Sequence, residues 1–174
     1  EVLDAGCPQP GRCRLTARTL ERGIEVRALT QDVFTSDVPA GRCLVEAEEV
    51  YTSYDIDALL DSPVTLEKHI VLACSEDERH GAACDCESEL DSAVEMGTEG
   101  AIESNRAWWD EIWQRIDVRI GGDDLAQFYL RFCLFHLTCA APRHTNKLSV
   151  PCKLITGEHY QGTTFYDTDL YTEA

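Results

Sequence analysis

The sequence is poor in basic side chains and contains no long apolar run. Lys and Arg together number 15 against 32 Asp and Glu, and the only lysines are Lys68, Lys147 and Lys153. The net charge of −17 argues against nucleic acid or an anionic membrane as a partner, because like charges repel. No apolar segment approaches the roughly 20 residues that span a bilayer. The first residues lack the basic and apolar parts of a secretory signal, so we expect a cytoplasmic protein.

The excess of carboxylates allows two interpretations. One is an ordinary acidic soluble protein. The other is adaptation to high salt, where surfaces rich in carboxylates and poor in lysine are common. The length of 174 residues fits one domain or parts of two, and a hydrophobic fraction of 44% is normal for a chain with a packed core.

Nine cysteines are many for a chain without a secretory signal. Because a core is available, we expect reduced thiols and no disulfide scaffold. Cys133 and Cys139 fall in an apolar helical pattern, where a free cysteine behaves as a small hydrophobe. The nearest approach to a metal motif is His80, Cys84 and Cys86, whose spacing matches no standard zinc pattern, so no metal site is expected.

The first third of the chain reads as strands. Apolar and charged residues alternate over 23–29, the pattern of a strand in a sheet with one solvent-exposed face. Further strands are expected over 43–47 and 63–72. The glycines and prolines between these runs are typical of turns.

The rest of the chain reads first as a linker and then as helices. A short helix is expected over 87–96, ended by Gly97, within a polar and acidic stretch. From residue 105 an apolar stripe at helical spacing, which includes Trp108, Trp109 and Trp113, predicts a second helix whose tryptophans pack in the core.

A third helix is expected over 125–140, after the break at 121–122. Asp123 or Asp124 can cap it, with Gln127 placed as in a capping box. This helix is apolar nearly all round, which is typical of a helix buried on most sides, and His136 is expected to have a hydrogen-bonded core role. The three strands and two helices expected here cannot easily bury such a helix, so we expect part of its apolar surface to face water in this chain.

The C-terminal segment 157–169 combines aromatic rings, glycines and carboxylates. Aromatic rings cover the apolar faces of sugars, and carboxylates accept hydrogen bonds from adjacent hydroxyls. Such a loop is more often an ordinary surface turn, so the residue types alone only suggest a sugar site.

An ordered set of motifs runs through the second half of the chain. The motifs are Trp108 with Trp113, then 117–123 (DVRIGGD), 131–137 (RFCLFHL), Pro142, 149–153 (SVPCK), 156–162 (TGEHYQG) and 165–169 (FYDTD). In this order they resemble glycoside hydrolase family 65, the inverting disaccharide phosphorylases. Upstream, residues 65–68 and the following linker are similar to the end of that family's N-terminal domain.

The resemblance implies an α+β chain that covers parts of two domains. Residues 1–75 would be the end of an N-terminal β-sandwich, 76–105 a helical linker, and 106–174 the first helices of an (α/α)6 catalytic barrel, truncated here. It also implies an inverting phosphorolysis of an α-glucosidic disaccharide, with phosphate as co-substrate and no metal or organic cofactor. The expected partner is the disaccharide, and the expected assembly of the parent is a homodimer.

Two alternatives remain beside the phosphorylase. A hydrolytic branch of the family, of the acid trehalase or glucosylgalactosyl-hydroxylysine glucosidase type, uses a second carboxylate to activate water. A non-catalytic or defective sugar-binding product is the third possibility, because this chain departs from the family pattern near the site.

Residue by residue, the resemblance places the family's Trp-Asp pair, which holds glucose in the donor subsite, on Tyr166 and Asp167. Asp167 matches, whereas Tyr166 replaces the usual tryptophan. Thr164 stands where a histidine is common, and Asp169 where a glutamate is usual. The general acid lies downstream of this motif in the family, so no catalytic residue is expected in this chain. Glu158 and Glu173 are expected to be structural or solvated.

Overall fold

The computed structural model describes residues 1–46, 48–57, 61–76, 85–141, 143, 149–153 and 163–165. The chain divides into two compact units, Glu1–Ser104 and Asn105–Ala174. We describe each unit by itself. The division expected from sequence, at residues 75 and 105, stays a prediction.

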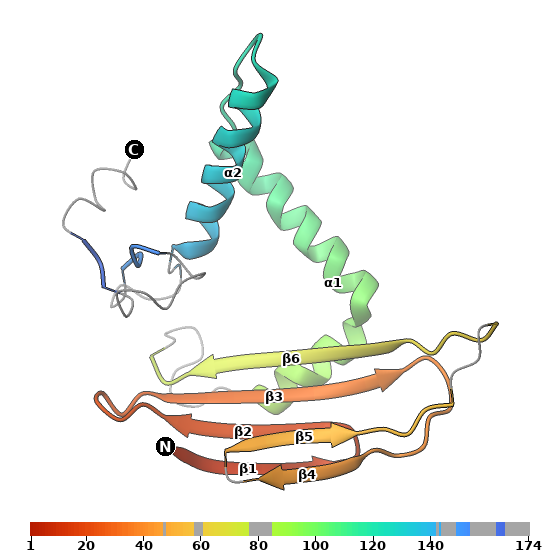
Figure 1. Ribbon diagram of the computed structural model, residues 1–174. Coiled ribbons are helices and arrows are strands. Elements are labelled where there is room, and N and C mark those ends of the chain that lie inside the picture. The colour runs from red at the N-terminus through yellow and green to blue at the C-terminus, as the bar shows by residue number, and fades with distance from the viewer. Residues whose placement is uncertain are drawn as a thin grey trace. The chain divides into compact units, whose positions relative to one another are not determined.

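Two antiparallel sheets form the first unit (Figure 1). The larger has the strand order β1-β2-β3-β6, and the smaller is the pair β4-β5. The expected strands correspond to β3, β4 and β6, whereas β1, β2 and β5 were not expected. The strand bounds are β1 Val2–Gln9, β2 Arg12–Arg18, β3 Glu25–Phe34, β4 Arg42–Glu46, β5 Glu49–Ser53 and β6 Leu66–Cys74.

One face of the larger sheet packs against the start of helix α1 (Cys86–Ile116). The register pairs Leu29 of β3 with Val71 of β6, and residues paired across neighbouring strands point to the same face of a sheet. Leu90 of α1 is completely buried there, and Leu29 is 2% exposed. The small core of this unit therefore lies between the sheet and the first turns of α1.

The opposite face of the larger sheet carries the β4–β5 hairpin over β1 and β2. A disulfide joins Cys7 of β1 to Cys43 of β4, with the two Cα atoms 6.2 Å apart. The expectation of reduced thiols throughout is therefore wrong for this pair. The hairpin folds back over β1 and brings together two cysteines separated by 36 positions, which the sequence did not reveal. Free thiols are carried by Cys13, Cys74, Cys133, Cys139 and Cys152.

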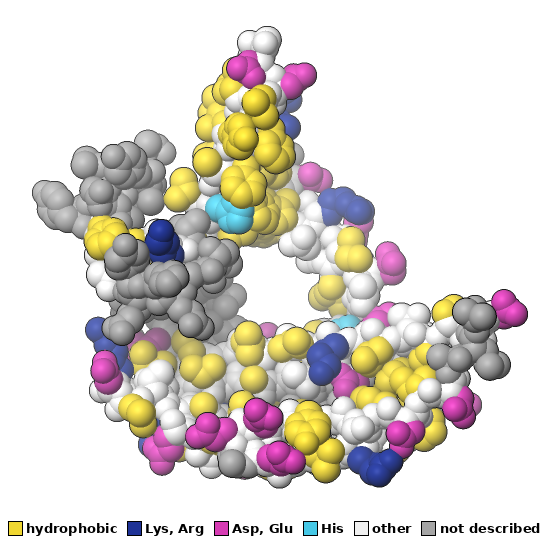
Figure 2. All heavy atoms as spheres, in the orientation of Figure 1, with side chains coloured by type: hydrophobic (Ala, Val, Ile, Leu, Met, Phe, Trp, Pro, Cys, Tyr) yellow, Lys and Arg dark blue, Asp and Glu magenta, His cyan; other side chains and the backbone are white. Residues whose placement is uncertain are grey.

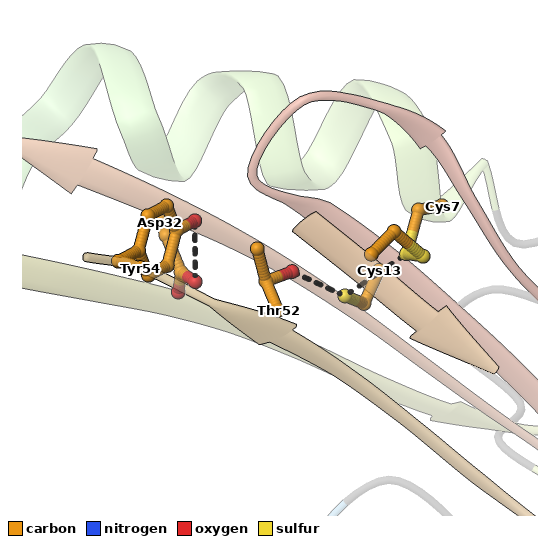
Figure 3. The surroundings of a disulfide bond; sticks show 6 residues. Cys7, Cys13, Asp32, Thr52 and Tyr54 are labelled. Carbon is orange, nitrogen blue, oxygen red and sulfur yellow. Dashed lines mark hydrogen bonds between the residues drawn. A yellow bond between two sulfur atoms is a disulfide. The ribbon is translucent and has the colours of Figure 1, made fainter. Parts of the chain in front are cut away.

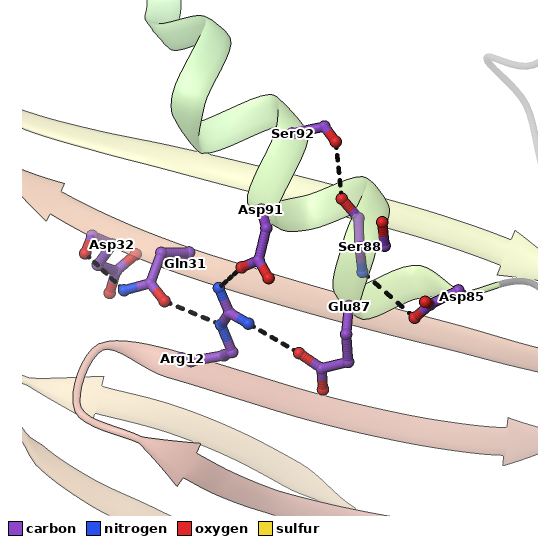
Figure 4. A network of polar contacts seen from close by, with 8 residues as sticks. All are labelled: Arg12, Gln31, Asp32, Asp85, Glu87, Ser88, Asp91 and Ser92. Atoms are coloured by element: carbon purple, nitrogen blue, oxygen red, sulfur yellow. Dashed lines mark hydrogen bonds and ion pairs between the residues drawn. The ribbon is translucent and has the colours of Figure 1, made fainter.

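A buried arginine fastens α1 to the sheet (Figure 4). Arg12 of β2 donates to Gln31 Oε1 at 2.9 Å, to Glu87 Oε2 at 2.8 Å and to Asp91 Oδ1 at 2.5 Å. The arginine side chain is 9% exposed, while the side chains of Glu87 and Asp91 are 45% and 65% exposed. Since every partner in this network is charged or strongly polar, the guanidinium tolerates its burial.

Helix α1 is interrupted at Gly97. Its φ of 68° and ψ of 174° are non-helical, and a positive φ is readily adopted by glycine alone. The expected end of a short helix at this glycine is confirmed, and helical structure then continues to Ile116.

The second unit contains the end of α1 and helix α2 (Asp124–Ala140). Trp109 stacks on Trp113 and on Phe135, with ring centroids 5.7 and 4.9 Å apart, so these two tryptophans pack against other rings as expected. The core position expected for Trp108 is wrong, because this side chain is 40% exposed. Asp123 is the N-cap and accepts from the Ala126 amide at 2.9 Å. The expected capping box is wrong, because the Gln127 side chain is used elsewhere.

Helix α2 leaves apolar surface exposed, as expected for this chain. Leu125, Phe128, Tyr129 and Phe132 are between 51% and 63% exposed, and Ala140 is the buried residue of the helix. Figure 2 shows hydrophobic side chains gathered over this helix. The described residues of this chain do not supply the surfaces that such a helix needs to bury its apolar sides.

Among the described residues, no helix is long and apolar enough to cross a membrane. No group of three His, Cys, Asp or Glu in the same described ranges could hold a metal ion. Of the weak metal motif, His80 and Cys84 lie outside those ranges, and Cys86 is buried at the start of α1.

Candidate functional site

Two hydrogen bonds shape the backbone that leads to the expected sugar-binding pair. The Cys152 amide donates to the Thr163 carbonyl at 3.2 Å, and the Thr164 hydroxyl donates to the Val150 carbonyl at 3.3 Å. Residues 150–152 and 163–164 therefore lie side by side. Thr164, which stands where the family commonly has histidine, ties its own segment to the neighbouring one.

The expected site residues themselves, Tyr166 and Asp167, lie outside the described residues. So do Glu158, Asp169 and Glu173. The described chain reaches Phe165, which is 45% exposed and directly precedes the pair. Binding of a sugar by Tyr166 and Asp167 therefore stays a prediction.

The clearest charged arrangement in the second unit is an ion pair between two of the family motifs. Arg131 of α2 donates to both oxygens of Asp117, at 2.8 and 2.5 Å. Such bidentate pairs are the stronger kind of charge-assisted hydrogen bond. The hydrogen bonds from Arg131 hold the pKa of Asp117 below its ordinary range, and Arg119 at 3.8 Å adds to the effect.

Gln127 of α2 binds the same turn. Its side-chain oxygen accepts from the Ile120 amide at 2.7 Å, and its nitrogen donates to the Val118 carbonyl at 3.0 Å. We call Asp117, Arg131 and Gln127 the turn brace. Both oxygens of Asp117 are occupied and its charge is stabilised, so the brace suits positioning of the turn and not proton transfer. The sequence motifs contained Asp117 and Arg131 but not Gln127, and the pairing of the first two across 14 positions was not expected.

A polar cavity lies in the first unit, on the helix-covered face of the larger sheet. Its volume is about 330 Å³. Arg14 in this cavity donates to Asp4 at 2.7 Å, and the Asp85 side chain accepts from the Ser88 amide at 3.2 Å. Glu87 pairs with Arg12 and Arg27 with Glu25, both from outside the lining. Because these charges are paired, the cavity offers no clear preference for an anion or a cation. The lining residues are Asp4, Arg14, Thr16, Arg27, Leu29, Asp85, Cys86 and Glu87.

Comparison with protein families gives two matches in chain order. The model described as "Glycosyl hydrolase family 65, N-terminal domain" matches residues 2–112, which is more than half of the chain. The model described as "Glycosyl hydrolase family 65 central catalytic domain" matches residues 131–173. Both matches are to one family of carbohydrate-active proteins. The chain belongs to glycosyl hydrolase family 65, as its motifs indicated.

Curated relatives are similar to part of this chain. A nigerose phosphorylase of Lachnoclostridium phytofermentans is 35% identical over 82 residues, which are 47% of this chain and 11% of the relative. A kojibiose phosphorylase of Thermoanaerobacter brockii is 28% identical over 119 residues, 68% of this chain and 15% of the relative. A protein of Mycobacterium tuberculosis named an uncharacterized glycosyl hydrolase is 38% identical over 80 residues, 46% of this chain and 10% of the relative.

The matched part of this chain thus spans 10% to 15% of the length of these relatives. The expected fold class is confirmed: antiparallel sheets followed by helices make an α+β chain, in agreement with a β-sandwich N-terminal domain and the start of a helical barrel. The match to the catalytic-domain model includes positions 166 and 167, but it assigns no role to either.

Proposed function

We propose that this chain is part of a phosphorylase that cleaves an α-glucosidic disaccharide. The observation that carries the proposal is the similarity to phosphorylases named for nigerose and kojibiose. The matches to the family's N-terminal and central catalytic domains, in chain order, support it. The products are glucose 1-phosphate and the released sugar. The co-substrate is inorganic phosphate, and the chemistry requires no metal or organic cofactor.

In this reaction phosphate attacks the anomeric carbon while a glutamic acid protonates the leaving oxygen, so the configuration inverts. The acid of the family lies downstream of the motif at 165–169, and we place it outside this chain. The contribution of this chain is then binding and positioning. A homodimeric assembly of the full-length protein stays a prediction.

Within this chain we assign donor-subsite binding to Tyr166 and Asp167. A tyrosine ring can cover the apolar face of glucose, and a carboxylate can accept from two adjacent hydroxyls. The bonds at Cys152 and Thr164 support the proposal, because they fix the backbone immediately before the pair.

The test uses the full-length protein that contains this sequence. Purified protein is incubated with nigerose, kojibiose, maltose and trehalose, with and without inorganic phosphate. We expect glucose 1-phosphate from one of these sugars, and no cleavage when phosphate is absent. Cleavage to two free sugars without phosphate would replace the phosphorylase with a hydrolase.

The hydrolase is the second candidate, since the mycobacterial relative is named a glycosyl hydrolase. The third candidate is a non-catalytic or defective product, suggested by Tyr166 and Thr164 in place of the family's tryptophan and histidine. Turnover of any kind excludes it. Absence of turnover on all four sugars, with sugar binding retained, would favour that third candidate.

Asp167→Asn in the full-length protein tests the assigned residue. The change keeps the shape and removes the charge, and hydrogen bonds to a charged group are worth roughly 1.5–3 kcal/mol each. With two hydroxyls held, we expect kcat/KM to fall on the order of 100-fold or more. Glu158→Gln is the matched control, because this carboxylate is assigned no role, and it should change kcat/KM less than about twofold. Equal losses in the two variants would remove Asp167 from the subsite.

A further inference from the structure

Three cysteines meet where the β4–β5 hairpin lies over the larger sheet (Figure 3). The disulfide joins Cys7 of β1 to Cys43 of β4. The free thiol of Cys13, on the neighbouring strand β2, lies with its sulfur 3.6 Å from the sulfur of Cys7. A thiol is thus in contact with one sulfur of an existing disulfide.

The proton of the Cys13 thiol has a partner on the side away from the disulfide. Thr52 Oγ1 of β5 lies 3.2 Å from Cys13 Sγ, nearer than Cys7 Sγ. When Cys13 donates to Thr52, a lone pair of its sulfur is free to face Cys7. The hairpin therefore contributes two parts of this arrangement: Cys43, which completes the disulfide, and Thr52, whose hydroxyl orients the Cys13 thiol.

We propose that Cys13 is an internal nucleophile that moves the disulfide from Cys7–Cys43 to Cys7–Cys13 and thereby releases the β4–β5 hairpin from its covalent bond to β1. The Cys13 thiol loses its proton to water, and the thiolate attacks Cys7 Sγ. The Cys7–Cys43 bond breaks as the Cys7–Cys13 bond forms. Cys43 leaves as a thiolate and takes a proton from water, so no oxidant or reductant is consumed.

The arrangement of β1 and β2 is compatible with a Cys7–Cys13 disulfide as well as with the Cys7–Cys43 disulfide. β1 and β2 are antiparallel neighbours, and the pairs Gly6–Arg14 and Gln9–Arg12 bracket Cys7 and Cys13. The register shifts between Gly6 and Gln9, so Cys7 and Cys13 are not a regular cross-strand pair, but their sulfur atoms already lie 3.6 Å apart. The new bond therefore needs only a short approach of two atoms on neighbouring strands.

Burial favours departure of Cys43. Cys43 is exposed, whereas Cys7 and Cys13 are partly buried. The leaving thiolate is therefore hydrated, and the new bond stays within the sheet. The bond across 36 positions constrains the unfolded chain more than a bond across 6, so the released form should be the less stable one.

The experiment follows the linkage in the intact chain. Protein is held at mildly alkaline pH without added thiol and with oxygen excluded, quenched with acid at intervals, alkylated with N-ethylmaleimide and mapped by mass spectrometry. We expect Cys43 to gain label as Cys13 loses it, in equal amounts. Cys13→Ser should lower the rate of Cys43 labelling at least tenfold. Cys74→Ser, a free thiol on β6, is the matched control and should keep the original rate.

Two outcomes would overturn the proposal: Cys43 that stays unlabelled in the original chain over a day, or equal labelling in the Cys13→Ser variant. Should Cys13→Ser not fold, Cys43→Ser gives a second test, because it leaves Cys7 and Cys13 as neighbouring thiols. Mild oxidation with oxidised glutathione should then form Cys7–Cys13 at least tenfold faster than any other pair, and the product should melt below the original chain. Failure to form this bond also refutes the exchange.

Discussion

The two units of the chain hold their helices in different ways. The start of α1 in the first unit has few apolar residues, yet its Leu90 is completely buried and Arg12 fastens it to the sheet. Helix α2 in the second unit is far more apolar, yet Leu125 and Phe128 are 63% and 60% exposed. The burial of a helix is thus decided by the partner surface available to it and not by its own apolar content.

The largest expected effect comes from truncating the same residue type in the two helices. Leu90→Ala opens a cavity in the core of the first unit, and we expect the free energy of unfolding to fall by about 2–5 kcal/mol. Leu125→Ala removes an exposed side chain and should change it by less than about 0.5 kcal/mol. Hydrogen exchange of the amides in β3 and β6, followed by mass spectrometry, measures the loss of stability in Leu90→Ala. Exchange of the α2 amides measures the change in Leu125→Ala. Similar losses at both positions would contradict the contrast.

The next effect concerns the exposed apolar side of α2. Contiguous apolar patches of this kind usually drive association. We expect the chain to bind a hydrophobic dye and to sediment as more than a monomer. Phe128→Gln with Phe132→Gln keeps helix propensity and should weaken self-association about tenfold, or about 1.4 kcal/mol. Leu20→Gln removes an isolated exposed leucine of the first unit and serves as the control. A monodisperse, cooperatively melting monomer with no dye binding would show that α2 is covered.

The smallest effect is the response of the turn brace to acid. Because Arg131 holds the pKa of Asp117 below its unfolded value, the pair adds stability above about pH 4, and this is lost as the pH falls through the lowered pKa. Arg131→Gln should therefore make the stability of the second unit less dependent on pH below 4. The fluorescence of Trp108, Trp109 and Trp113, all in this unit, reports it. Arg115→Gln is the control, because it breaks an exposed pair with Glu111 instead. If both variants show the same dependence of stability on pH, the ion pair of Asp117 with Arg131 does not explain the acid response.

The sequence predicted the helices well because their period is local. The stop at Gly97 and the N-cap at Asp123 depend on residues within one turn. Strand β2 was not expected, since the face that packs toward α1 carries Arg12 and Arg14, the reverse of the usual pattern. A buried arginine becomes tolerable only when Glu87 and Asp91 arrive from positions more than 70 residues away.

The family was predictable from short motifs, whereas the contacts that use them were not. Asp117 and Arg131 stood in separate motifs, and only the antiparallel return of α2 brings them together. The Cys7–Cys43 bond likewise depends on the hairpin. Tyr166 and Asp167, expected from the resemblance, lie outside the described residues.

The phenol of Tyr54 provides an optical signal for the state of the hairpin. It follows β5 and donates to Asp32 of β3 at 3.0 Å. Burial, together with this bond to a carboxylate, raises the pKa of Tyr54 to about 12. An ordinary tyrosine ionises near 10, so Tyr54 stays colourless at 295 nm over a range in which ordinary phenolates already absorb. When the hairpin lifts from the sheet, Tyr54 loses both its burial and its hydrogen bond to Asp32. Its pKa then returns toward the ordinary value for tyrosine. The ultraviolet spectrum thus follows the docking of the hairpin without a label.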